Sequence, residues 1–151
     1  MHGVESTVIT LRENDIWILR SGPITAEDLR PFARTVAVAN RTALPNAPGQ
    51  LKSHYAPATA LRLLAAGAQP LGDSRRRIGL LAWRSAELVT GFEATEVLSG
   101  TGDLREAAAT LFAKLRRLDA AGLEQIIAES VPEEGLGIAI NDRLRKAAGN
   151  G

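Results

Sequence analysis

The sequence contains no cysteine, one tyrosine and only two histidines. Without thiols the chain can form no disulfide, no thiolate nucleophile and no zinc–thiolate site. The histidines, His2 and His54, are too few for an all-histidine metal centre, and neither lies in an HExxH pattern. Aromatic residues make up 4% of the chain, which leaves few platforms on which bases could stack. We therefore expect no metal site.

The chain also lacks an excess of charge of either sign and any long apolar run. Its net charge is +1, from 18 Lys and Arg against 17 Asp and Glu. This balance gives no general electrostatic case for binding nucleic acid or a membrane surface. No stretch of about 18 apolar residues is present, and the first residues do not follow the pattern of a secretion signal. We expect a soluble, non-secreted, cytoplasmic protein without a membrane partner.

The length of 151 residues, 45% of them hydrophobic, suits one full domain with an appendage. Over residues 40–57 the composition changes to Pro, Ala, Asn, Gly and Ser without a period, which is typical of a linker. We therefore divide the chain into residues 1–39, a linker over residues 40–57, and a domain over residues 58–151.

The first part carries two strand patterns and one helical pattern. Residues 4–11 and 16–20 are rich in β-branched residues around a polar turn, which predicts a hairpin. A lone hairpin is marginal in water, so it should dock on the second part or fray. Thr25 can cap a helix over residues 26–39, although Pro31 could bend it or delay its start.

The domain over residues 58–151 alternates strand and helix patterns. Asp103 caps the clearest helix, which ends at Gly122, and a last helix runs over residues 136–147. Residues 85–90 suit one helical turn. The strand patterns lie at residues 59–64, 78–83, 95–99 and 124–129. This order predicts a three-layer α/β domain with a mostly parallel sheet of about four strands.

The linker holds the only tyrosine and one of the two histidines. Pro48-Gly49 marks a turn, and Pro57 favours an extended chain before it. His54 and Tyr55 bring polar tips on rigid rings that a loop could present to another domain. The alternative is a plain spacer whose tyrosine covers a nearby apolar face.

Pro48-Gly49 followed by His54-Tyr55-Ala56-Pro57 resembles the interdomain linker of two-domain threonylcarbamoyl-AMP synthases. In that family a YrdC-like catalytic domain precedes a smaller Rossmann-like domain, and methionine usually stands where Leu51 is. The resemblance extends over most of the chain. The other matching segments are residues 5–8, 18–20, 98–108, 115–119 and 135–144.

The resemblance implies roles for four residues. The serine at the position of Ser6 lies against the substrate pocket, and the arginine at the position of Arg20 meets the nucleotide phosphates. His54 and Tyr55 would form a lid over the active site. Without the resemblance, Ser6 would be an ordinary strand hydroxyl and Arg20 a solvated charge. The family usually has Pro-Gly after that arginine, whereas Ser21-Gly22-Pro23 stands here, so the turn that aims Arg20 could differ.

The resemblance also implies a reaction. The intact enzyme makes threonylcarbamoyl-AMP from ATP, with magnesium, threonine and bicarbonate, and the product serves tRNA modification. The family's Lys-x-Arg and Ser-Asn segments have no counterpart here. We therefore expect the chain to be the C-terminal portion of such an enzyme, inactive and without cofactor by itself, with a missing or separate YrdC-like domain as its partner. The rival reading is a free-standing regulatory or ligand-binding α/β module.

Other motifs have modest interpretations. Gly135-Leu136-Gly137 could suggest a dinucleotide site but fits a tight turn better. Residues 99–102 could hold an anion on free N–H groups, although a capped loop is favoured. Two basic clusters could touch tRNA, but we expect solvated faces and no direct tRNA binding. They are Arg75-Arg76-Arg77 and the group Arg143, Arg145 and Lys146. Asp142 beside Arg143 suggests a cap or a surface pair.

Overall fold

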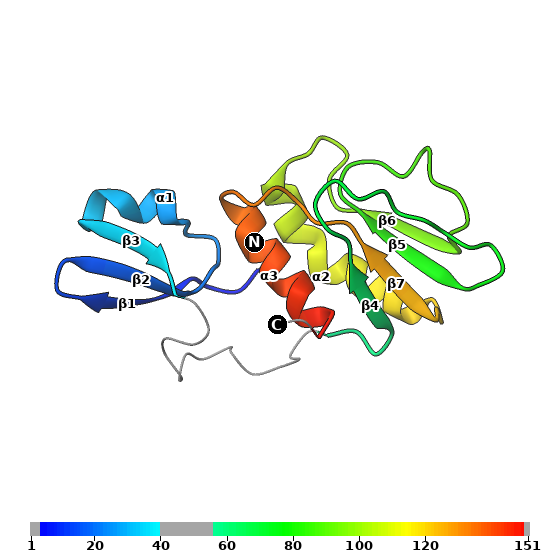
Figure 1. Ribbon diagram of the computed structural model, residues 1–151, viewed down its shortest axis with the longest axis horizontal. Coiled ribbons are helices and arrows are strands. Elements are labelled where there is room, and N and C mark those ends of the chain that lie inside the picture. Colours follow the sequence, from blue (N-terminus) through cyan, green and yellow to red (C-terminus); the bar gives the residue numbers. More distant parts are fainter. Residues whose placement is uncertain (1–3, 40–55, 150–151) are drawn as a thin grey trace.

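A computed structural model describes residues 4–39 and 56–149. Two β-sheets lie on either side of a pair of long helices (Figure 1). We call the three-stranded sheet formed by residues 8–38 sheet A, and the four-stranded sheet formed by residues 60–128 sheet B. Within the described ranges, no helix is both long enough and apolar enough to cross a bilayer.

Sheet A contains the expected hairpin. Strands β1 (Val8–Arg12) and β2 (Asp15–Arg20) pair antiparallel through a turn in which Glu13 has a φ of 54°. A third strand, β3 (Thr35–Val38), then pairs parallel with β2. Ile16 and Ile18 of β2 are buried, so the middle strand of sheet A carries its core.

The prediction of one helix over residues 26–39 is wrong. Helix α1 (Ala26–Leu29) gives way to a single 3₁₀ turn, η1 (Arg30–Phe32), and Ala33 is extended. Pro31 has no N–H to donate and its ring crowds the preceding turn, so the helix cannot continue through it. The sequence Thr-Val-Ala-Val that follows is rich in β-branched residues and forms β3 instead.

Sheet B is fully parallel, as expected. Its order is β4-β7-β5-β6, so the last strand inserts between the first two. The bounds are β4 (Ala60–Leu63), β5 (Ile78–Ala82), β6 (Ala94–Val97) and β7 (Gln125–Ala128). Every residue of β5 is buried, which confirms that this apolar run is covered on both faces.

Helices α2 (Leu104–Ala120) and α3 (Leu136–Ala147) cover one face of sheet B. Asp103 caps α2 as predicted, with its carboxylate accepting from the N–H groups of Arg105 and Glu106. The main core lies between these helices and the sheet. Its largest fully buried residues are Leu81, Leu98, Leu111, Leu118, Ile126, Ile140 and Leu144.

The opposite face of sheet B is covered by a loop over residues 84–93. Ala86, Val89 and Phe92 pack on a second apolar cluster that includes Ile78 and Leu80. The helical turn expected at residues 85–90 is wrong, because the loop makes only one turn bond, from Val89 N–H to the Ala86 carbonyl. The three layers are therefore the pair of helices α2 and α3, sheet B, and the loop over residues 84–93.

Candidate functional site

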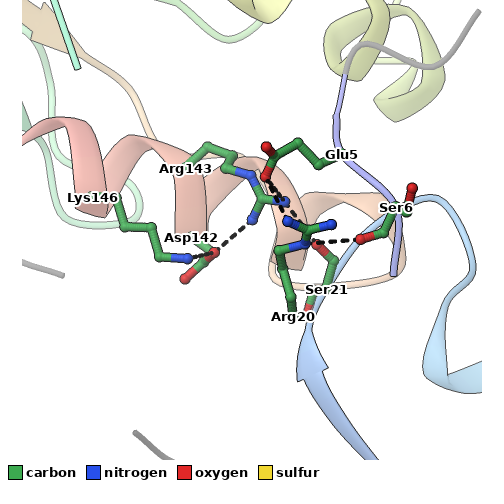
Figure 2. Close-up of polar contacts among 7 residues, drawn as sticks. All are labelled: Glu5, Ser6, Arg20, Ser21, Asp142, Arg143 and Lys146. Carbon is green, nitrogen blue, oxygen red and sulfur yellow. Dashed lines mark hydrogen bonds and ion pairs between the residues drawn. The ribbon is translucent and has the colours of Figure 1, made fainter. Parts of the chain in front are cut away.

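Arg20 ends β2 beside the segment that leads into β1. Its Nε donates to the Ser6 carbonyl at 3.0 Å, and one terminal nitrogen donates to the Glu5 carboxylate at 3.2 Å (Figure 2). The register pairs Arg20 with Val8, which brings residues 5–7 alongside the end of β2. The structure thus brings together Ser6 and Arg20, two of the four residues for which the resemblance implied roles. Ser6 is exposed, whereas the Arg20 side chain is largely buried.

Gly22 allows the turn after β2 to lie directly on that segment. A Cβ at this position would lie 2.4 Å from the Glu5 carbonyl oxygen and 2.4 Å from the Thr7 nitrogen. The Thr7 hydroxyl also accepts from the Ile24 N–H at 3.1 Å and donates to the Ile24 carbonyl at 2.7 Å. The turn is therefore fixed by backbone contact, and it holds Arg20 against residues 5–7.

Arg143 of α3 reaches the same place from the other half of the molecule. It is only 6% exposed, and its guanidinium donates to the Ser21 carbonyl at 3.2 Å and to Asp142 at 2.7 Å. A terminal nitrogen also lies 3.5 Å from the Glu5 carboxylate. Glu5 consequently lies between two guanidiniums, Arg20 on one side and Arg143 on the other (Figure 2).

A cleft of about 160 Å³ opens beside Arg20, between sheet A and α3. Lys146 pairs with Asp142 at 2.9 Å, and Arg145 pairs with Glu133 outside the cleft. The lining consists of Leu19, Arg20, Ser21, Val38, Ala39, Ile138, Asp142, Arg145 and Lys146. Each cation of the lining already has a carboxylate partner, because Arg20 pairs with Glu5, Arg145 with Glu133 and Lys146 with Asp142. The buried Arg143 beside them leaves the group with one surplus positive charge, which favours an anionic ligand.

The loop before α2 is capped. The Ser99 hydroxyl accepts from the Asp103 N–H at 2.8 Å and bonds the Glu106 carboxylate, while Asp103 occupies the next N–H groups. The Ser99 hydroxyl and the Asp103 carboxylate thus satisfy the N–H donors that an anion would need, and the carboxylates of Asp103 and Glu106 repel an anion. The favoured interpretation of residues 99–102 as a capped loop fits this geometry.

The glycine pair at the start of α3 forms a tight turn. Gly135 has a φ of 48°, and Gly137 lies against the Pro132 carbonyl. A Cβ on Gly137 would lie 1.8 Å from that oxygen, so the glycine serves close packing of α3 on the preceding loop. No part of this arrangement requires a dinucleotide.

The first basic cluster is neutralised by neighbouring acids. Arg75 pairs with Asp73 at 3.1 Å, Arg76 with Glu124 at 2.9 Å and Arg77 with Glu93 at 3.8 Å. All three arginines lie at the surface, as expected for a solvated face. Exposed pairs of this kind contribute little to stability.

The expectation for Arg143 is wrong, because this residue is buried and is not part of a solvated face. It follows Ile140 by three residues and Leu136 by seven, which is the spacing of the apolar stripe of α3. This helical spacing was the signal in the sequence from which the burial of Arg143 could have been predicted. Glu5 was also missed as a site residue, because nothing local marks a carboxylate that pairs with an arginine 138 positions later.

His54 and Tyr55 are outside the described residues. Among residues 4–39 and 56–149, no group of three or more His, Asp or Glu side chains could hold a metal ion.

A parallel α/β domain packs beside a small mixed sheet, and a cleft lined by two arginines and a lysine lies between them, which defines a two-part α/β protein. The family described as threonylcarbamoyl-AMP synthase, C-terminal domain, matches residues 24–149. The chain therefore belongs to this family. The match begins before residue 40, and the three-part division made from the sequence stays a prediction.

Similar proteins agree with this assignment. The chain is 32% identical to the threonylcarbamoyl-AMP synthase of Bacillus subtilis and 33% identical to that of Pyrococcus abyssi, and each match covers 97% of the chain and 46% of the relative. The crystal structure of P. abyssi Sua5 complexed with L-threonine has a TM-score of 0.79 at 27% identity, over 97% of this chain and 46% of that one.

A second structure of the P. abyssi protein, in which one histidine and one tyrosine are replaced by alanine, has a TM-score of 0.75 at 26% identity. That match covers 98% of this chain and 46% of the other. The chain thus spans about half the length of the relatives that it matches and corresponds to their C-terminal region. The family and the fold class expected from the sequence are confirmed.

Proposed function

We propose that the chain is the C-terminal part of an L-threonylcarbamoyladenylate synthase, which converts ATP, threonine and bicarbonate into threonylcarbamoyl-AMP for tRNA modification. The observation that carries the proposal is the match of 97% of the chain to proteins with this name. A P. abyssi relative has been crystallised with L-threonine, which supports threonine as a substrate.

The contacts of Arg20 support a role as a phosphate ligand. A guanidinium has five N–H donors in a planar fork, and the two contacts with Ser6 and Glu5 leave others for phosphate oxygens. The charged groups around the neighbouring cleft, Arg143 included, carry one surplus positive charge, which suits ATP because its magnesium complex is still anionic. The exposure of Ser6 supports a contact between its hydroxyl and a substrate.

Sheet A exposes apolar side chains that a complete catalytic unit would cover. Phe32 is 79% exposed and Leu11 68%, and both line an open groove of about 450 Å³. The other large apolar residues exposed on residues 4–39 are Ile9, Ile24 and Val38. We propose that they pack against the catalytic region that the relatives carry in their additional length.

We also propose that His54 and Tyr55 close over the site. The P. abyssi variant shows that a histidine and a tyrosine of that relative were singled out for replacement. Closure of a lid would exclude water from an unstable carbamate intermediate.

A two-part enzyme tests the function. The N-terminal region of the B. subtilis relative is joined to residue 1 of this chain, and pyrophosphate release is measured with ATP, magnesium, threonine and bicarbonate. We expect release that requires both threonine and bicarbonate from the joined protein, and none from the chain alone. Activity of the chain alone would contradict the expected dependence on a catalytic region. A folded but inactive joined protein would favour the reading as a separate binding module.

A further inference from the structure

We propose that Arg143 is a positioning residue that holds the phosphate-binding arginine, Arg20, in place from the C-terminal domain. The inference rests on the proposed function, because it concerns the same site. It assigns to α3 a role in nucleotide affinity that does not require α3 to touch the nucleotide.

The first support is the burial of Arg143. A guanidinium that is 6% exposed must be compensated by nearby acceptors, because an uncompensated buried charge is very costly. Two of its acceptors, the Glu5 carboxylate and the Ser21 carbonyl, belong to residues 4–39, more than 120 positions before Arg143 in the sequence. Arg143 therefore ties α3 to the two segments that flank Arg20 (Figure 2).

The second support is how those acceptors act on Arg20. The Glu5 carboxylate accepts from Arg20 at 3.2 Å and pairs with Arg143 at 3.5 Å, so Arg143 restrains the carboxylate that orients the Arg20 side chain. The Ser21 carbonyl, bonded at 3.2 Å, belongs to the residue directly after Arg20. Arg143 thus restrains Arg20 through both its side-chain partner and its backbone.

The third support is the charge balance. Arg20, Arg143 and Lys146 carry three positive charges, whereas Glu5 and Asp142 carry two negative ones. The cluster therefore has a surplus positive charge at the edge of the cleft, which an anion would neutralise. The Arg143 Nε is also buried without an acceptor among the described residues. Such a donor costs stability as long as it has no acceptor.

Kinetics of the joined enzyme test the positioning role. Arg143→Met keeps the length of the side chain but removes its charge and donors. We expect the KM for ATP to rise roughly 3- to 30-fold, while the KM for threonine stays within about twofold, because only the phosphate ligand loses its orientation. Arg143→Lys should restore part of the ATP affinity, because an ammonium can still pair with Glu5.

Arg117→Met is the matched control, because Arg117 is an exposed arginine of α2 whose ion-pair partner is Glu96 of β6. It should leave both constants unchanged. An unchanged KM for ATP in the Arg143→Met enzyme would overturn the proposal. A uniform loss of activity that follows loss of folded protein would overturn it as well, because that is the signature of a purely structural residue.

A second measurement does not depend on activity. In ¹⁵N NMR spectra of the 151-residue chain, the Arg20 Nε–H should be protected from exchange by its bond to Ser6. We expect Arg143→Met to accelerate that exchange about tenfold and Arg117→Met to leave it unchanged. Equal rates in both variants would contradict the proposal even if the joined enzyme is active. If wild-type joined enzyme makes no product, the proposed function fails, and the NMR result still decides whether Arg143 restrains Arg20.

Discussion

At the scale of single residues, Asp119 connects the end of helix α2 to the segment that leads into β4. Its carboxylate accepts from the Thr59 N–H at 2.8 Å and the Ala58 N–H at 3.2 Å, which fixes the approach to β4 against the end of α2. These hydrogen bonds hold the pKa of Asp119 below its ordinary value, and the bonds from Thr59 have the largest effect. The ionised Asp119 carboxylate therefore stabilises the folded chain.

Replacement of Asp119 by alanine should lower the free energy of unfolding by about 1 kcal/mol at neutral pH, because two backbone donors lose an ionised acceptor. The folded-state pKa is depressed, so this contribution is full above the unfolded pKa, near 3.8, and is lost as the pH falls through the lower folded pKa. Urea unfolding at about pH 7 and at about pH 2.5 measures the difference.

Asp119→Asn is the control for charge, because it keeps one acceptor oxygen. We expect the free energy of unfolding of Asp119→Asn to lie between those of wild type and Asp119→Ala at neutral pH. Its difference from Asp119→Ala should change little with pH. A gap between wild type and Asp119→Ala that stays constant down to pH 2.5 would contradict the account.

The candidate site shows what local sequence can reveal about residues. Ser6 and Arg20 could be selected because matching motifs surround them, and they do lie together. Glu5 and Arg143 could not be paired from the sequence, because their contact depends on how α3 docks on sheet A. A buried arginine is recognisable by helical spacing, but its partner is set by tertiary structure.

At the scale of elements, α3 depends on a glycine at its first turn. Gly137→Ala would place a methyl group 1.8 Å from the Pro132 carbonyl oxygen, so the helix or the loop must move. We expect a loss of about 1–3 kcal/mol, which corresponds to a fall in Tm of roughly 2–12 °C in a chain of this size. Thermal unfolding followed by circular dichroism measures it.

Gly100→Ala is the matched control, because a Cβ there meets nothing within 4 Å and Gly100 lies at the surface. Its Tm should change by less than about 2 °C. If Gly137→Ala is as stable as Gly100→Ala, the close approach of α3 to the Pro132 loop is not a feature of the folded protein.

Most elements followed from the sequence, and the failure at residues 26–39 has a physical cause. Leu29, Phe32 and Val36 have helical spacing, which suggested one apolar face. However, Phe32 is 79% exposed and Val36 lies in β3. The spacing alone could not show this, because β3 gains its hydrogen bonds from β2, a partner outside the local window. In sheet B, the order β4-β7-β5-β6 likewise depends on long-range pairing.

At the scale of the whole molecule, the two sheets differ in how well they are supported. Ile18 lies in the middle strand of sheet A and Ile126 in an inner strand of sheet B, and both are almost fully buried. Sheet B is covered on both faces, whereas sheet A exposes several large apolar side chains. Sheet A should therefore open at a lower free energy than sheet B.

Hydrogen exchange of the chain measures this difference. We expect the amide of Ile18 to exchange at least about tenfold faster than that of Ile126, and to slow when the N-terminal region of the B. subtilis relative is attached. Equal protection of the two amides in the chain alone would indicate one cooperative unit, and it would contradict the view that sheet A is incomplete without a further region.

The central claim is that this chain supplies a phosphate-binding arginine to a threonylcarbamoyl-AMP synthase. The KM for ATP of the joined enzyme, with Arg20 and with Arg20→Met, tests it most directly. We predict a rise of about tenfold or more on replacement, since hydrogen bonds from a charged donor to phosphate are lost. An unchanged KM for ATP in a folded, active Arg20→Met enzyme would contradict the account.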